Sequence, residues 1–178
     1  MKKIIGILII ALSILSLSSY AFAGSFNVTW VYDGDTFKAE GYDIEIVVRF
    51  MAIDAPEISY RKGEPSQPFS EQSKKVLMDL ILNRTVEIEG YGLDKRNRVL
   101  AVVSLGGKNI GVEMIRQGLA EVYQGELPDD FDLKVYRQAE FQAKTSRRGM
   151  WSQGDSYISP MEWRERERRR RGAGMDRP

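Results

Sequence analysis

The 178-residue chain contains neither cysteine nor histidine. Without cysteine it cannot form disulfides, so an apolar core must hold the fold together. Without histidine it cannot carry a Ser-His-Asp or Cys-His catalytic group, a histidine general base or a histidine-rich zinc site. Any catalysis must therefore depend on carboxylates, arginines, lysines, tyrosines or a hard metal ion.

The net charge of +1 conceals an uneven distribution along the chain. Residues 164–178 hold seven arginines against three acids, whereas residues 24–163 hold 17 basic and 22 acidic residues, a net of −5. An acidic body is not typical of a passive DNA-binding surface, and it is compatible with a site that binds a cation first.

The arginine-rich tail, residues 154–178, has two interpretations. It is either a solvated helix end that frays into partial disorder, or an electrostatic contact with nucleic acid or an anionic envelope surface.

The first 23 residues have the pattern of a bacterial secretory signal peptide. Two lysines precede an apolar run over residues 4–17, and an A-x-A cleavage signal ends at Ala23. The run is short for a membrane span, although an uncleaved anchor is the alternative. We expect an exported protein, in the periplasm or the medium, whose mature chain starts near Gly24 and is not stably inserted in the membrane.

The rest of the pattern predicts an α+β, mainly β fold. Strands are expected at residues 26–32, 36–40, 43–53, 86–92 and 98–105. Helices are expected at residues 68–83, 110–117 and about 130–147, with Ser66 or Ser70 as the cap of the first. Short strands with a helix between the third and the fourth fit a five-stranded Greek-key barrel of the OB type.

Two stretches raise the question of a site. In Asp33-Gly34-Asp35 the Asp-Gly pair alone predicts a hairpin turn, and the functional alternative is that one carboxylate faces a metal. Arg49 stands in an apolar run, where it must either pair with an acid or point outward from an edge strand.

The end of the third strand supplies partners for these groups. Asp54 and Asp35 offer carboxylate oxygens, and Pro56 frees the carbonyl of Ala55 by preventing strand pairing. Such an oxygen set favours Ca²⁺ or Mg²⁺ over zinc. Glu57, just beyond, is placed to orient or deprotonate a water. Taken alone, the same stretch reads as a proline turn with solvated acids.

Arginines are the second half of the pattern. A guanidinium chelates phosphate oxygens bidentately and stays charged at any working pH. Arg49 can therefore pair with an anionic substrate, and the polar turn at residues 93–97 places Arg96 and Arg98 as further candidates.

Over roughly residues 26–153 the order and spacing of these motifs resemble the staphylococcal nuclease (thermonuclease) family. Each motif is weak alone, and four in order are specific. They are Asp33-Gly34-Asp35-Thr36, Arg49 with Asp54-Ala55-Pro56-Glu57, Asp94-Lys95-Arg96-Asn97-Arg98 and Arg116-Gln117-Gly118-Leu119-Ala120.

The resemblance implies a five-stranded OB barrel with three helices over residues 24–153. It implies Ca²⁺-dependent hydrolysis of phosphodiesters in DNA and RNA, with low sequence specificity and 3′-phosphate products. Single strands are the expected preferred substrate, because a barrel groove accommodates an unpaired strand best, and a monomer is expected.

The resemblance also implies roles for single residues. Asp35 and Asp54 correspond to Ca²⁺ carboxylates and Ala55 to a carbonyl ligand. Glu57 corresponds to the residue that activates water, and the transition state is stabilised by two arginines, Arg49 and Arg98.

The chain departs from the family's type member at three places. Ala55 replaces Thr, Arg96-Asn97 replaces Tyr-Gly, and Tyr123 is the one tyrosine where the type member has nucleotide-stacking tyrosines. We expect Lys95, Arg96 and Tyr123 to contact the substrate.

Two other classes remain as alternatives. An OB barrel can bind nucleic acid without cutting it, and an envelope protein could use the arginine tail to dock. Neither needs the full set of acids and arginines, so the nuclease is the preferred interpretation.

Overall fold

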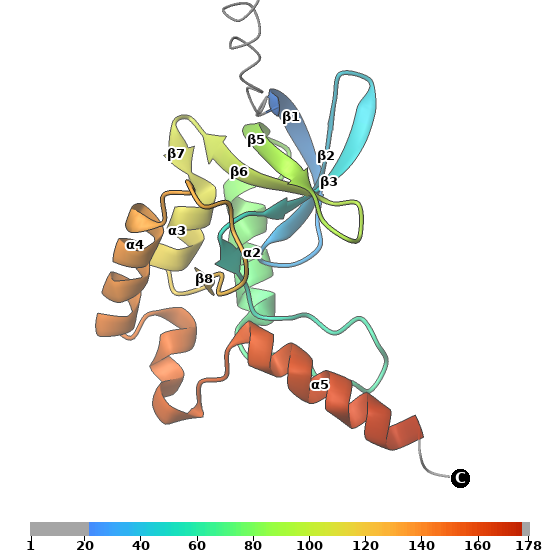
Figure 1. The fold of residues 1–178 in the computed structure, drawn as a ribbon, viewed down its shortest axis with the longest axis vertical. Coiled ribbons are helices and arrows are strands. Elements are labelled where there is room, and N and C mark those ends of the chain that lie inside the picture. The colour runs from blue at the N-terminus through green and yellow to red at the C-terminus, as the bar shows by residue number, and fades with distance from the viewer. Residues whose placement is uncertain (1–21, 176–178) are drawn as a thin grey trace, which may run out of the picture.

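The computed structural model describes residues 22–175, and its centre is a closed barrel (Figure 1). Its strands are β1 (Phe22–Val31), β2 (Thr36–Gly41), β3 (Ile44–Phe50), β5 (Thr85–Leu93) and β6 (Val99–Leu105). Neighbours run antiparallel in the order β3-β2-β1-β5-β6, and β3 closes the sheet by pairing in parallel with β6. The expected five-stranded barrel is confirmed.

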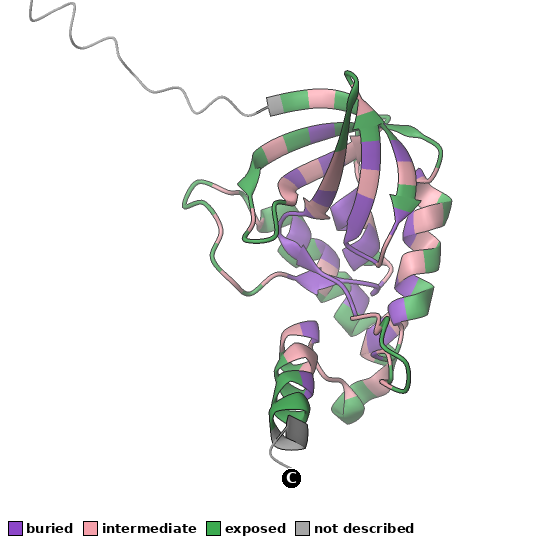
Figure 2. Ribbon diagram, turned by 90° about the vertical axis from the view of Figure 1, so that its right-hand side faces the viewer, coloured by how far each residue is buried: buried purple, intermediate pink, exposed green. Residues whose placement is uncertain are grey.

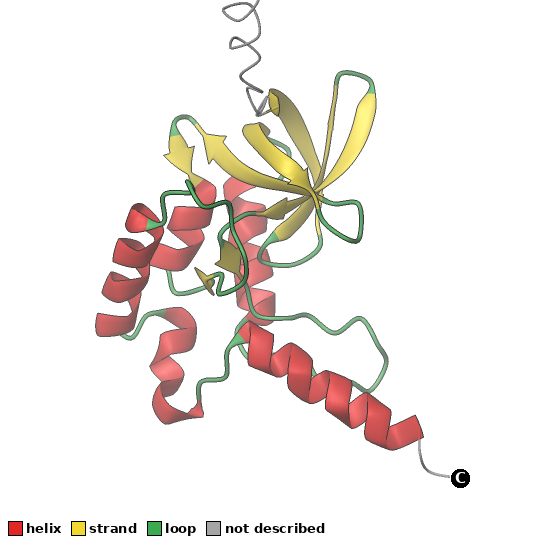
Figure 3. Ribbon diagram, in the orientation of Figure 1, coloured by secondary structure: helices red, strands yellow, loops and turns green. Residues whose placement is uncertain are grey.

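Helices gather at one end of the strands (Figure 3). They are α2 (Ser70–Ile81), α3 (Ile110–Arg116), α4 (Lys134–Thr145), the 3₁₀ segment η1 (Gly149–Ser156) and α5 (Pro160–Met175). Three short strands, β4 (Ile53–Asp54), β7 (Lys108–Asn109) and β8 (Glu121–Val122), complete the fold. In the stretch from 22 to 175, no helix has the length and apolarity to cross a membrane.

Nearly all of the expected signal peptide lies outside the described residues. The predicted cleavage point after Ala23 falls within the first residues of β1, where Ala23 is opposite Glu89 of β5.

The core fills the barrel and continues under the helices (Figure 2). Along β1 the period of two places Phe26 and Val28 inside and Asn27 outside. A register shift between Val28 and Trp30 then returns Val31 to the core. Fully burying such side chains contributes about 1.5–3 kcal/mol each, which is the stabilisation that a chain without disulfides needs.

Two expected helix starts are wrong. Neither Ser66 nor Ser70 caps α2, because the helix begins after Phe69, whose φ of 70° turns the chain into it without a side-chain cap. The helix expected from residue 130 starts at Lys134. The amide of Phe131 instead donates to the carbonyl of Pro128 in a turn, and its ring contacts Tyr136.

Most of the arginine-rich tail belongs to a helix, because Pro160–Met175 form α5. The amide of Glu162 donates to Ser159 Oγ, so Ser159 caps the helix and Pro160 takes its first position. Ion pairs such as Glu162–Arg166 follow at spacings of three and four residues. The start signal Ser-Pro-x-Glu was already present in the sequence.

Changing Gly34 to alanine is expected to destabilise the fold by roughly 1–3 kcal/mol through overpacking. An added Cβ would lie 1.9 Å from Ser73 Oγ, which donates to the carbonyl of Leu119. Urea unfolding measures the effect. Gly172→Ala, at an open position on α5, is the matched control, and equal stability of the two variants would contradict the packing account.

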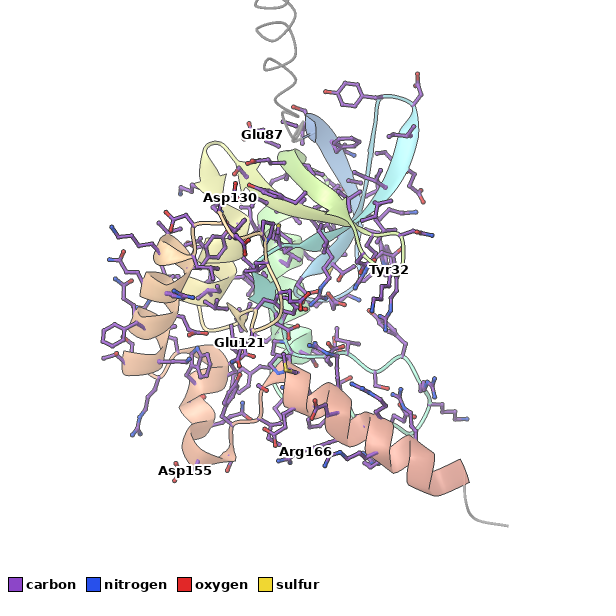
Figure 4. The ribbon with its side chains drawn as sticks, viewed as in Figure 1. Tyr32, Glu87, Glu121, Asp130, Asp155 and Arg166 are labelled. Atoms are coloured by element: carbon purple, nitrogen blue, oxygen red, sulfur yellow. The ribbon has the colours of Figure 1, made fainter. Side chains whose placement is uncertain are left out.

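Glu121 should make stability depend on pH. It is buried in β8 opposite Asp54, near the centre of the molecule (Figure 4), and burial raises its pKa to about 7. Between pH 4.5 and 7 the folded chain then holds a proton that the unfolded chain has lost, so this group's contribution falls as pH rises, by up to about 3 kcal/mol.

The measurement is the free energy of unfolding of the wild type and of Glu121→Gln at pH 5 and pH 8. The wild type should lose stability relative to the variant on going to pH 8. If the difference in unfolding free energy between the wild type and the variant were the same at pH 5 and pH 8, Glu121 would be excluded as the source of the pH dependence.

Candidate active site

Arg49 brings together two buried aspartates from different parts of the barrel. Strand register places it opposite Thr36, beside Asp35. Its Nη1 donates to Asp35 Oδ1 at 2.7 Å and its Nη2 to Asp54 Oδ1 at 2.9 Å. The side chains of Asp35 and Asp54 are 3% and 1% exposed. Because β3 is paired on both sides, the alternative of an outward arginine on an edge strand is wrong.

The backbone conformation at Ala52 directs Asp54 toward Arg49 and Asp35. Ala52 has a φ of 64°, an uncommon value for a residue with a side chain, and it redirects the chain between β3 and β4. The amide of Ala55 then donates to Asp35 Oδ2 at 3.0 Å, and Thr36 Oγ1 donates to Asp35 Oδ1 at 2.8 Å. The turn at Asp33-Gly34 is thus a hairpin turn and also the support of a buried carboxylate.

Glu57 lies on the segment after Pro56. Gln67 holds that segment through two hydrogen bonds. Its side-chain Oε1 accepts from the backbone amide of Glu57 at 3.0 Å, and its backbone amide donates to the backbone carbonyl of Glu57. Burial raises the pKa of Glu57, and the charges of Asp35 and Asp54 act in the same direction against Arg164. A carboxylate with a raised pKa is suited to accept a proton near neutral pH.

Asp33 is an acid of this cluster that the sequence reasoning did not assign to the site. Its Oδ1 accepts the amide of Asp35 at 3.0 Å, and burial together with the charge of Asp35 raises its pKa.

The turn between β5 and β6 positions the second arginine. Asp94 accepts the amides of Arg96 and Arg98, and Asn97 adopts the left-handed φ of 59° that the turn requires. The Arg98 guanidinium pairs with Asp94 at 2.6 Å and donates to Thr36 Oγ1 at 3.3 Å. Arg98 therefore lies next to the residue that touches Asp35.

One cavity of about 890 Å³ connects these groups. Its walls include the three residues expected in catalysis and the three expected to contact substrate: Arg49, Glu57, Arg98, Lys95, Arg96 and Tyr123. The buried aspartates lie directly behind Arg49. The structure thus brings all nine expected site residues into one region.

The donor chemistry fits a hard cation. Across residues 22–175, no group of three acidic side chains is placed to hold a metal by itself. Asp35 and Asp54 nevertheless bind one positive group, the Arg49 guanidinium, together. Further oxygen ligands would come from the Ala55 carbonyl, water or substrate, which is the mixture that Ca²⁺ accepts.

Sequence reasoning missed Arg164 of α5. Its Nη1 donates to Asp54 Oδ1 at 2.8 Å and to Glu57 Oε1 at 2.6 Å, and its Nη2 donates to Asp54 Oδ2 at 2.7 Å. The cap signal at Ser159 would have predicted the helix. No local pattern in the sequence indicates that Arg164, which lies 110 residues after Asp54, contacts the Asp54 carboxylate.

Comparison with known proteins agrees with this geometry. Residues 47–153 match the family described as staphylococcal nuclease homologue. A probable endonuclease LCL3 of Debaryomyces hansenii is 34% identical over 146 residues, covering 79% of this chain and 62% of that protein. An uncharacterized endonuclease of Haemophilus influenzae is 35% identical over 144 residues, covering 80% and 74%.

The chain spans between about half and two thirds of the LCL3 relatives that it matches first. The family match nevertheless covers more than half of this chain and includes the segment that carries Arg49, Asp54, Glu57 and Arg98. The chain therefore belongs to the staphylococcal nuclease homologue family.

Proposed function

We propose that this protein is an exported Ca²⁺-dependent endonuclease that hydrolyses phosphodiesters of DNA and RNA to 3′-phosphate products. The observation that carries the proposal is the Asp35–Arg49–Asp54 cluster, with Glu57 and Arg98 on the same cavity. The names of its relatives, a probable and an uncharacterized endonuclease, support the same reaction class. Export rests on the signal-peptide pattern of residues 1–23.

The arginines bind and stabilise the reacting phosphate. Arg49 and Arg98 both line the cavity, and a guanidinium group presents a planar fork of donors that matches phosphate oxygens. As water attacks phosphorus, negative charge grows on the equatorial oxygens, and the hydrogen bonds from the two guanidinium groups strengthen with it.

Glu57 accepts the proton of the attacking water. The new P–O bond forms from the water oxygen, and the bond from phosphorus to the 5′ oxygen breaks. The 3′ side keeps the phosphate, and the leaving 5′ oxygen takes a proton from solvent. The raised pKa of Glu57 strengthens it as a base.

Asp35, Asp54 and the Ala55 carbonyl would hold the Ca²⁺ ion. When bound, Ca²⁺ supplies Lewis-acid polarisation of a phosphate oxygen.

Substrate binding is expected to show little sequence preference. Lys95, Arg96 and Tyr123 line the cavity, and they offer charge and one stacking ring rather than hydrogen bonds to base edges. Such a groove favours a single strand, and the protein is proposed to act as a monomer. A non-catalytic binding module, the runner-up, would need these contacts but not a buried pair of aspartates beside Glu57.

Arg98→Ala and Arg49→Lys are expected to lower kcat/KM on denatured DNA by about 10²–10³, because each removes a donor or its bidentate geometry. Steady-state cleavage assays measure this. Arg137→Ala, at an exposed position on α4, should cut at the wild-type rate. Near-wild-type rates in both site variants would remove the arginines from the mechanism.

Residues 24–178 are expected to cut denatured DNA and RNA with Ca²⁺ and to stop when a chelator is in excess. Glu57→Gln should lose roughly 10²–10⁴ of the rate, the usual worth of a general base, while still binding the strand. Products should need a 3′-phosphatase before a polymerase extends them. A folded wild type that binds strands without cutting them would establish the binding module instead.

A further inference from the structure

Helix α5 forms one wall of the active-site cavity. Arg164, Glu167, Arg168 and Arg171 line it, and their spacing of three and four residues places them on one helix face. Arg166 does not belong to this face of the helix, and it pairs with Glu162 (Figure 4).

Arg164 is the residue of this face that contacts the acids of the candidate active site. Asp54 Oδ1 accepts from Arg49 and from Arg164, and Asp54 Oδ2 accepts from Arg164. Glu57 Oε1 accepts from the same Arg164 nitrogen that reaches Asp54. One guanidinium thus holds the oxygens that the proposed reaction needs for cation binding and for water activation.

Two further contacts hold the helix against the segment that carries Glu57. Arg171 pairs with Glu64 at 2.7 Å, and the Gln67 amide group donates to the Ile158 carbonyl at 2.8 Å. Figure 1 shows α5 alongside this connection, at the end of the molecule away from the β2–β3 hairpin.

These contacts are polar, so ions or charged ligands can replace them. In the part of α5 whose burial is described, only Pro160 and Glu167 are buried, and neither belongs to the apolar core. A helix held mainly by ion pairs is weakened by salt and by competing ions. Displacing it does not require the core to open.

We propose that α5 is an autoinhibitory latch, in which Arg164 closes the site until a divalent cation takes its place on Asp54 and nucleic-acid phosphates bind the released arginine. This inference rests on the proposed function. Arg49 contacts only Oδ1 of Asp54, whereas Arg164 contacts both oxygens, so a cation that binds Oδ2 and the Arg164 guanidinium exclude each other. Once released, Arg164, Arg168 and Arg171 can pair with phosphates, which bind arginine as carboxylates do.

The first test measures Ca²⁺ binding by calorimetry in the full mature chain. Arg164→Gln should bind Ca²⁺ about tenfold more tightly, because the apparent affinity of the wild type is its intrinsic affinity multiplied by the fraction of open molecules, here about one in ten. Arg166→Gln, the same change on the same helix, should match the wild type. Unchanged or weaker Ca²⁺ binding by Arg164→Gln would overturn the latch.

The second test locks the helix. The chain has no cysteine, so Glu64→Cys with Arg171→Cys can be joined by a short bifunctional methanethiosulfonate without side reactions. The joined protein should lose Ca²⁺ affinity and cleavage, and a reductant should restore both. Reagent-treated wild type is the control, and full activity in the joined state would contradict the proposal.

The outcomes separate the latch from the proposed function. If the wild type cuts with Ca²⁺ but Arg164→Gln only weakens strand binding, Arg164 is a substrate contact and the latch is wrong while the nuclease stands. If the wild type and Arg164→Gln both fail to bind Ca²⁺ and to cut, the proposed function and the latch fail together.

Discussion

The guanidinium of Arg49 is the group on which the rest of the site depends. It joins Asp35, from the turn after β1, to Asp54, at the end of the strand that follows β3. Removing one partner from such a buried cluster typically costs 3–5 kcal/mol, because the remaining charge is left without compensation. The two buried carboxylates therefore depend on Arg49 for their charge compensation, and the same pairing holds them on one guanidinium group.

The cluster remains acidic after that pairing, and this accounts for its other contacts. Desolvation and the charge of Asp35 raise the pKa values of Asp33 and Glu57, which lie beside it. A cation nearby acts in the opposite direction, because it favours the ionised form of each carboxyl group. Arg164 is such a cation in this structure, and the proposed Ca²⁺ would take this role during turnover. Autoinhibition and catalysis are then two uses of one electrostatic property.

Several features could be predicted from local pattern because local physics decides them. Alternating apolar residues specify the barrel strands, and Asn97 tolerates the left-handed turn that carries Arg98. The start of α2 could not be predicted in this way, because a left-handed Phe69 replaces the expected serine cap. The prediction that a helix starts near residue 130 was wrong because a turn at Pro128 precedes α4.

The sequence by itself determined the chemistry that is available: a chain without histidine or cysteine must work with carboxylates, arginines and oxygen-bound cations. It also determined the order of the motifs and, through Ser159 and Pro160, the existence of α5. Only the tertiary structure decided that Arg164 lies on Asp54 and Glu57. A contact across 110 residues depends on how helix and barrel are placed relative to each other, and no local periodicity carries that information.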